Sequence, residues 1–151
     1  MITYEVPQAQ ILALQKKFEG LGDALISKQI VETIALQIKE NILQRTQTGK
    51  DLYGKTFKPY TLKYATKEGK NVVNLTNSGI MLNDITQKAM SNDTAKIFFM
   101  RKESARLAQI HNDGEGKMPQ RRFFGVGTSD RAESIKIYKD LAKREMAKRG
   151  L

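Results

Sequence analysis

The chain has 151 residues, of which 40% are hydrophobic and 28% charged, a balance typical of one soluble globular domain. It contains no cysteine, which excludes disulfides, thiolate zinc sites and cysteine nucleophiles. Lysine and arginine exceed aspartate and glutamate by 26 to 16, so the net charge is +10. Such a charge indicates either an acidic partner such as nucleic acid or a solvated basic surface.

Nothing in the sequence predicts a membrane segment or an export signal. The longest apolar runs, such as "KIFFM" at 96–100, are far shorter than the roughly 20 residues that a membrane helix needs. The N-terminal "MITYEVPQAQ" lacks a basic segment followed by an apolar one. We therefore expect an intracellular place of synthesis and no membrane partner.

Two helices are predicted over residues 8–45. Ile11, Leu14 and Phe18 recur at the spacing of a short amphipathic helix, which "GLGD" at 20–23 interrupts. A second helix of about 20 residues follows, because isoleucines recur at four-residue intervals and would form one buried face. These are Ile30, Ile34, Ile38 and Ile42.

The middle of the chain predicts a loop and then a hairpin. Residues 46–73 contain glycines, a proline and many lysines without an apolar period, so they are predicted to form a long exposed loop. Thr76 or Ser78 could cap a short helical turn. "ITQKAM" and "AKIFFM" flank the turn-forming "SNDT", which predicts an antiparallel hairpin. A short helix is then expected over 103–114, ending at Gly114 before a glycine-rich joint.

The chain is predicted to end in a basic helix. Asp130 and Glu133 have the spacing of a capping box, and an apolar stripe follows them. The stripe comprises Ile135, Tyr138, Leu141, Ala142 and Met146. The predicted fold is α+β, a small antiparallel sheet packed against two or three main helices. We expect one domain over 1–151, divided into helices (8–45), exposed loop (46–73), hairpin and joint (74–127) and basic helix (128–151).

One segment fits the pattern of a nucleotide-binding phosphate loop. "GKDLYGKT" at 49–56 supplies the glycines, the lysine and the threonine of that pattern. A phosphate loop must follow a buried strand and open a helix, whereas here a helix precedes it and Pro59 would break a helix after it. We therefore interpret the match as chance and predict no nucleotide site.

Other catalytic and metal-binding chemistry is weakly indicated. His111 is the only histidine, and no serine near it has the context of a nucleophile. His111, Asp113 and Glu115 could hold a divalent ion, but their spacing is not that of a calcium loop. Gly125 and Gly127 suggest a tight turn into the last helix. The sequence predicts no catalytic residue, no metal and no cofactor.

Four phrases occur in an order that resembles the bacteriophage virion-morphogenesis and tail-completion family of Mu-like phages and related prophages. The early loop has glycine, an aromatic residue and proline, as in "YGKTFKP", and a leucine, Ser-Gly, leucine phrase follows in "NLTNSGIML". A short helix then ends in His111 and Gly114. The fourth phrase, P-x-R-x-F-x-G, comprises Pro119, Arg121, Phe123 and Gly125. The resemblance covers about residues 49–145, and Phe57 stands where tryptophan is common.

The resemblance implies an α+β fold and a structural, non-enzymatic role in the virion. The implied role is tail completion or head-to-tail joining in the neck, as a tail-terminator or neck ring. The implied partners are copies of the chain itself, in a ring that could be a hexamer, and the tail-tube and head-tail connector proteins. Transient contact with genome DNA is also expected, because DNA passes through a phage neck.

The expected contact surfaces are the early loop and the joint, since loops on a rigid frame meet partners readily. The expected contact residues are Gly54, Phe57, Pro59, Pro119, Arg121, Arg122, Phe123 and Phe124. The alternative for Phe123 or Phe124 is that one of them fills the core. The alternative function is a stand-alone nucleic-acid-binding protein that uses its basic last helix. The DNA-facing residues would then be Lys136, Lys139, Lys143 and Arg144.

Overall fold

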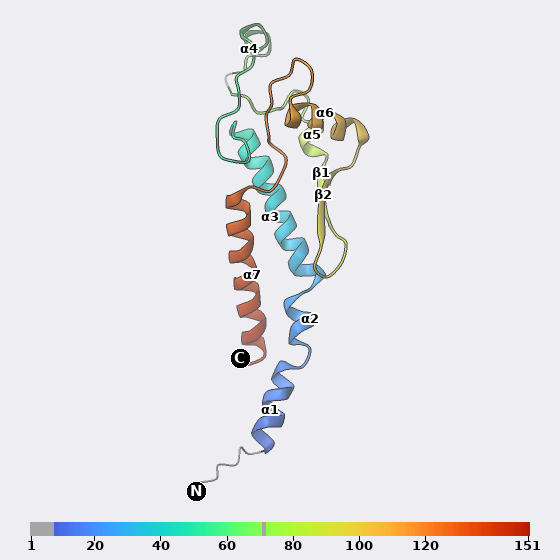
Figure 1. Ribbon diagram of the computed structural model, residues 1–151, viewed down its shortest axis with the longest axis vertical. Helices are drawn as coiled ribbons and strands as arrows, with labels where there is room; N and C mark the ends of the chain where they lie inside the picture. The colour runs from blue at the N-terminus through green and yellow to red at the C-terminus, as the bar shows by residue number, and fades with distance from the viewer. Residues whose placement is uncertain (1–7, 71) are drawn as a thin grey trace.

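The protein is elongated (Figure 1). A head of short elements lies at one end, and a shaft made of the first two helices and the last helix extends away from it, beside the central helix and the hairpin. The computed structural model describes residues 8–70 and 72–151. The helices are α1 (Gln8–Phe18), α2 (Leu21–Leu25), α3 (Lys28–Gln47), α4 (Leu62–Glu68), α5 (Ile80–Asn83), α6 (Lys102–Asp113) and α7 (Thr128–Lys148). The strands are β1 (Ile85–Ala89) and β2 (Ala95–Phe99). The predicted α+β fold with a small antiparallel sheet is confirmed.

Helix α3 is the central element, with α7 on one side and the hairpin on the other (Figure 1). Its N-cap is Ser27, whose hydroxyl accepts a hydrogen bond from the Ile30 N–H at 3.4 Å. Ile30 and Ile42 are buried, while Ile34 and Ile38 are half-buried. The predicted isoleucine-rich helix is therefore confirmed, and its apolar face packs against the sheet.

The predicted hairpin is also present. Ile85 pairs with Phe99 at one end of the ladder, and Ala89 pairs with Ala95 at the other. The turn closes with a hydrogen bond from the Met90 N–H to the Thr94 carbonyl at 2.8 Å. A two-stranded hairpin is marginal by itself, so its packing against α3 supplies the stability it needs.

The hydrophobic core lies where α3, the hairpin and the head meet. Phe123 and Ile42 are its largest fully buried apolar side chains, with 0% and 1% of their surface exposed. The other core members come from the head and from β1. They are Phe57, Val73, Leu75, Met81, Leu82, Ile85 and Ala108. The core therefore joins segments from residue 42 to residue 123 in one cluster.

The predicted long exposed loop, residues 46–73, is only partly correct. It contains helix α4, which the Thr61 hydroxyl caps by accepting a hydrogen bond from the Tyr64 N–H at 3.4 Å. Gly69 ends this helix in the left-handed conformation. Phe57 within the same segment is buried in the core. Apolar periodicity missed α4 because none of its residues is buried.

The short elements of the head match their predictions closely. Helix α5 begins after Gly79, and the Ser78 hydroxyl accepts a hydrogen bond from the Ile80 N–H at 3.4 Å. Thr76, the other predicted cap, bonds the Asn74 carbonyl instead. Helix α6 ends at Gly114, which has a left-handed φ of 71°, as predicted.

The last helix begins at residue 128, as predicted, but the residues that cap it differ from the predicted pair. Helix α7 begins at Thr128, so Asp130 lies inside its first turn, and its carboxylate accepts the Gly127 N–H at 2.7 Å. Glu133 does not complete a capping box with Asp130, since it accepts a hydrogen bond from Asn41 at 2.6 Å. Asp130 therefore caps the start of α7 from its third helical position and also binds α3, whereas Glu133 only attaches α7 to α3.

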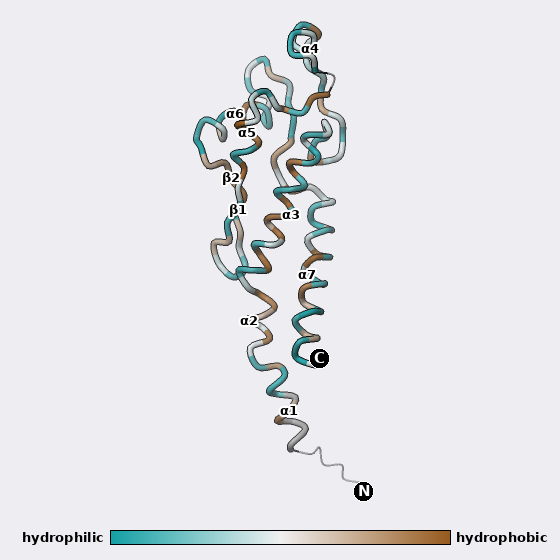
Figure 2. The backbone as a smooth tube through the Cα atoms, turned by 180° about the vertical axis from the view of Figure 1, so that it is seen from behind, coloured by the Kyte–Doolittle hydropathy of each residue, from teal (hydrophilic) through white to brown (hydrophobic). Residues whose placement is uncertain are grey.

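The predicted apolar stripe of α7 is not a buried face. Ile135, Tyr138 and Met146 are exposed, whereas Leu141 and Ala142 are half-buried. Figure 2 shows apolar and polar segments alternating along this helix. The reason is that α7 packs mainly against α2 and α3, which cover one side of it.

Helix α1 is present where predicted, and one of its three predicted apolar residues has a described side chain. Phe18 is exposed, and the side chains of Ile11 and Leu14 lie outside the described residues. Helix α1 packs against α2. The Lys17 ammonium group donates to the Gly150 carbonyl at 3.1 Å, which joins the end of α1 to the end of α7.

Candidate functional site

The four phrases that carry the family resemblance meet in the head, although they are far apart in the sequence. Arg121, in the fourth phrase, makes the contacts that join the other segments. Its Nε donates to the Lys58 carbonyl at 2.9 Å, and its Nη2 donates to the Pro59 carbonyl at 3.1 Å. Its backbone N–H donates to the His111 carbonyl at 2.8 Å. One residue therefore ties the early loop, the end of α6 and the joint together.

Tyr60 adds the second phrase to this cluster. The Arg121 guanidinium carbon lies 5.0 Å from the centre of the Tyr60 ring, which is the geometry of a cation–π contact. The Tyr60 hydroxyl accepts a hydrogen bond from the Leu75 N–H at 3.2 Å. Burial raises the pKa of Tyr60, so the hydroxyl stays protonated at neutral pH. The ring thus holds the 75–82 segment against Arg121.

Gly114 allows the joint to fold back onto α6. Its φ is +71°, and an added Cβ would lie only 2.8 Å from the backbone nitrogen of Gln120. Only glycine fits both the left-handed conformation and this close approach. The turn brings Arg121 beside His111, at the end of the same helix.

A groove of about 580 Å³ opens beside Arg121, between α5, α6, the start of α4 and the joint. Its volume lies within the range of ligand-binding clefts, roughly 300–1,000 Å³. Both polar and apolar side chains line it. The polar ones include Tyr60, Tyr64, Ser104, His111 and Arg121, and the apolar ones include Leu75, Ile80, Met81, Leu107 and Met118.

Burial lowers the pKa of two basic groups that line this groove, His111 and Arg121. Burial lowers the pKa of His111, and the nearby positive charge of Arg121 lowers it further. Burial also lowers the pKa of Arg121, an effect that Tyr60 opposes. The groove therefore has an unusual floor, made of a neutral imidazole beside a buried guanidinium.

Comparisons of the chain with protein-family models, with curated proteins and with solved structures found no match. The resemblance to the phage family therefore stays a prediction that rests on the four phrases. The geometry adds that these phrases form one hydrogen-bonded cluster in the head.

Three of the expected contact residues are buried, which corrects their predicted place on a contact surface. Phe57, Arg121 and Phe123 expose 4%, 3% and 0% of their surface. Phe57 and Phe123 belong to the core, and Arg121 holds backbone carbonyls of the early loop. For Phe123, the alternative of filling the core is thus the correct one.

The other expected contact residues keep access to solvent. Gly54, Pro59 and Arg122 are exposed, while Pro119 and Phe124 are half-buried. The Phe124 ring packs 4.8 Å from the Phe99 ring of the hairpin, measured between centroids. The Arg122 carbonyl accepts the Leu52 N–H at 2.9 Å, so the early loop and the joint lie side by side.

The segment that resembles a phosphate loop has a different geometry. The Asp51 carboxylate accepts the N–H groups of Tyr53 and Lys55 at 2.9 and 2.8 Å. These N–H groups are of the kind that would face a phosphate, and the carboxylate would repel one. The next helix begins only at Leu62. The segment is a small closed turn, braced by a bridge between Lys50 and Thr56.

The residues considered for a metal ion are not gathered into a site. Glu115 pairs with Arg106, with their charged atoms 2.6 Å apart. Within residues 8–70 and 72–151, no group of at least three acidic or imidazole side chains could hold a metal ion. No helix in the same part of the chain has the length and apolar character to span a membrane.

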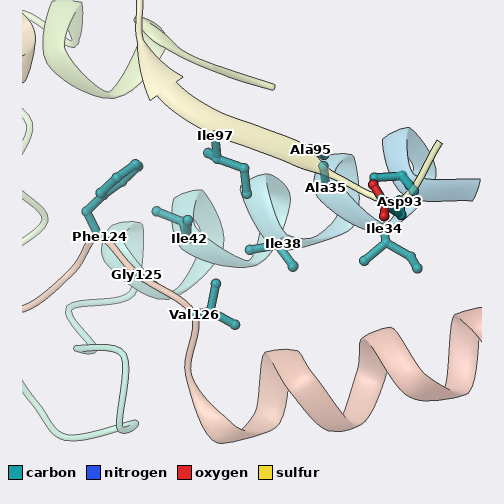
Figure 3. Close-up of a pocket in the computed structure, with 11 residues that line it drawn as sticks. Ile34, Ala35, Ile38, Ile42, Asp93, Ala95, Ile97, Phe124, Gly125 and Val126 are labelled. Carbon is teal, nitrogen blue, oxygen red and sulfur yellow. The ribbon is translucent and has the colours of Figure 1, made fainter. Parts of the chain in front are cut away.

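A second hollow, of about 410 Å³, lies along α3 between the hairpin and the joint. Figure 3 shows isoleucines from α3 and β2 facing Phe124 and Val126 across it. Its lining is apolar except for Asp93 at one end. This hollow offers packing surface but no group that would orient a polar ligand.

The basic residues of α7 form a separate exposed surface. Lys136, Lys139, Lys143 and Arg144 are all exposed, as the nucleic-acid hypothesis requires. Ile135, Tyr138 and Met146 are exposed on the same helix. Exposed apolar side chains among cations are more typical of a protein-contacting surface than of one that tracks phosphates.

The groove was not predicted from the sequence, because the residues that line it come from segments that are far apart in the chain. Tyr60 and Tyr64 are four residues apart, and their ring centroids are 4.8 Å apart, which a helical reading of "YTLKY" could have indicated. Nothing in the sequence around Leu107 or Met118 indicates that these residues line a groove. Ser104 is buried, although serine is usually exposed, and nothing in the sequence around it indicates this.

Proposed function

We propose that the protein is a non-enzymatic structural component of a phage or prophage particle, acting in tail completion or head-to-tail joining as a neck or tail-terminator ring. The observation that carries this proposal is the order of the four phrases, supported by their assembly around Arg121 in one cluster. Residues that recur together in a family are expected to share a structural task, and here they do. The proposal places the protein in the virion, after synthesis in the host cytoplasm.

The exposed apolar side chains of the shaft support an assembling protein. Ile135, Tyr138 and Met146 of α7, and Leu12 and Phe18 of α1, are 37% to 58% exposed. Exposed large apolar side chains close together on a helix are typical of contacts between proteins. In a ring of copies, or on a tail tube, these side chains would be covered.

The test is electron microscopy of particles from a lysate in which this gene alone is deleted from its phage or prophage. The proposal predicts filled heads beside unattached or abnormally long tails, and complete virions when the wild-type gene is supplied in trans. Complete virions from the deletion lysate would contradict it.

Variants supplied in trans separate a contact role from a folding defect. The double variant Ile135→Asp/Tyr138→Asp should fold, because both side chains are exposed, and should fail to restore joined particles. The matched control is Lys136→Asp/Lys139→Asp, which adds the same carboxylates to neighbouring positions without removing apolar surface. If apolar contact carries the role, the control variant should restore joined particles. If the basic charge of α7 carries it, the control variant should fail to restore them.

A second candidate function is the binding of nucleic acid through α7, because its four cations are all exposed. The test is duplex DNA binding at several salt concentrations. If four cations contacted phosphates, the logarithm of the binding constant would fall with the logarithm of salt at a slope of about −3.6. The variant with all four changed to glutamine should then lose this dependence, whereas a neck component should bind DNA weakly in both forms.

A further inference from the structure

The groove beside Arg121 has an apolar rim that solvent reaches. Ile80, Leu107 and Met118 line it and are 51%, 44% and 40% exposed. They come from three separate segments, α5, α6 and the joint, so their proximity is a product of the fold. Tyr60 and Tyr64 also line the groove.

The floor of the groove contains a buried cation that lacks an anionic partner. Arg121 is 3% exposed and lines the groove. It forms no ion pair with any carboxylate in the described part of the chain, and its Nη1 makes no hydrogen bond there. Burying a charge costs free energy unless a partner of opposite charge balances it. The nearest comparison is Arg45, which is also largely buried but pairs with Asp130 at 2.6 Å.

His111 supplies a second unused polar atom at the same place. Its Nδ1 is buried, has no hydrogen-bond partner among the described residues, and belongs to a side chain that lines the groove. An imidazole Nδ1–H can donate a hydrogen bond to an oxygen of a carboxylate. Buried polar atoms are nearly always satisfied, so an unsatisfied one beside a cavity indicates a missing partner.

We propose that this groove binds a segment of a partner protein in which an aspartate or glutamate is flanked by apolar side chains. The carboxylate would pair with Arg121 and accept from His111, while the apolar side chains would cover Ile80, Leu107 and Met118. Charge complementarity selects this occupant, because one buried guanidinium matches one carboxylate and the rim matches apolar residues. Nucleic acid fits poorly, since phosphates require several exposed cations, whereas the described lining offers one, Lys117, together with the acidic Glu103. The proposal does not depend on the role in the virion.

The first experiment selects random 12-residue peptides, displayed on a carrier, against the immobilised full chain. We expect enrichment of peptides with an acidic residue between apolar ones. Arg121 itself is a poor first variant, because it also holds the Lys58 and Pro59 carbonyls and its loss could unfold the head. Leu107→Asp avoids this problem, since Leu107 is exposed on a helix and the new carboxylate would repel the acidic peptide.

The matched control is Leu36→Asp, which makes the same change at a leucine of similar exposure, 42% against 44%, on a helix outside the groove. We expect the enriched peptides to bind wild type and Leu36→Asp equally, and Leu107→Asp at least about tenfold more weakly. No enrichment of acidic peptides, or equal binding to all three proteins, would overturn the proposal.

The second experiment uses His111 as an internal probe, because it is the only histidine in the chain. Its imidazole resonances are followed by NMR against pH, with and without the best enriched peptide. A bound carboxylate should raise the pKa of His111, and the same peptide with asparagine or glutamine in place of the acid should bind at least about tenfold more weakly. Equal binding of the amide peptide would overturn the proposal. So would His111 resonances that shift only with protein concentration, since the groove would then take a second copy of the chain.

Discussion

The head and the shaft of this protein are stabilised in different ways. The head comprises residues 48–84 and 100–127, and the shaft comprises α1, α2 and α7. Within the head, buried side chains and long-range hydrogen bonds fix each segment on another. Among the described side chains of the shaft helices, only Leu21 and Asp130 are buried. The difference indicates that the head specifies its own structure, whereas the shaft helices leave large apolar side chains exposed.

The junction between the two regions is built from charge rather than apolar packing. Arg45 near the end of α3 donates to Asp130 at 2.6 Å and to the Gly125 carbonyl at 2.6 Å. Asp130 also accepts a hydrogen bond from Asn41 at 3.1 Å. The start of α7 is therefore fixed to α3 by charged and polar groups, and its far end is held by the Lys17 bond to the Gly150 carbonyl.

The largest expected effect separates a phenylalanine of the head from one of the shaft. Phe123→Ala should lower the free energy of unfolding by about 3–5 kcal/mol, because it leaves a cavity in the core. Phe18→Ala removes a side chain that is 51% exposed, and should change the free energy of unfolding by less than about 0.5 kcal/mol. Urea denaturation of both variants measures the difference. Similar losses would show that the two regions are not distinct.

The junction should be nearly as sensitive. Asp130→Ala should cost about 3 kcal/mol of unfolding free energy, since Arg45 would remain buried without its carboxylate partner. Asp140→Ala on the exposed face of the same helix is the control, and should cost less than about 0.5 kcal/mol. The same denaturation measurement applies, and an equal cost for both changes would contradict the role given to the ion pair.

A smaller effect is expected at the turn that returns the joint to α6. Gly114→Ala should cost at least about 2 kcal/mol, because both its left-handed backbone and the contact with Gln120 are unfavourable to a Cβ. Gly54→Ala is matched in φ, at +80°, but nothing lies within 4 Å of the added Cβ, so it should cost about 1 kcal/mol. Thermal unfolding of the two variants isolates the close approach, and equal costs would argue against it.

The smallest effect is a dependence of head stability on pH. The pKa of His111 is lowered in the folded protein below its ordinary value of 6.5, so the unfolded chain binds a proton more readily. Stability from this group is therefore fully present above about pH 6.5 and decreases as the pH falls below it. Unfolding of wild type and His111→Gln at pH 7 and pH 5 should show a smaller decrease in the variant. An identical decrease would contradict the burial of the imidazole.

Local features of the structure were predictable from the sequence. The four isoleucines of α3, the turn residues between β1 and β2 and the glycine that ends α6 each act through neighbours a few residues away. Periodicity and turn chemistry report such neighbours directly. The fold class followed from them, because the order of the elements already indicates helices against a small sheet.

The candidate site was not predictable in the same way. Arg121 was expected on a contact surface, since arginine favours interfaces. It is buried instead, and its guanidinium donates hydrogen bonds to the carbonyls of Lys58 and Pro59. Nothing near Arg121 in the sequence indicates a partner some sixty residues earlier. The apolar stripe of α7 failed for the opposite reason. Its period was read correctly as helical, but periodicity does not show whether a second layer covers the stripe, and here Ile135 and Tyr138 remain exposed.

The most direct test of the contrast between head and shaft is native-state hydrogen exchange, followed amide by amide. The backbone N–H groups of Leu52, Leu75 and Arg121 make long-range hydrogen bonds in the head, so they should exchange only through global unfolding. Amides in α1 and in the second half of α7 should exchange faster, through local opening that leaves the head folded. Equal protection in both regions, or faster exchange in the head than in the shaft, would contradict this account.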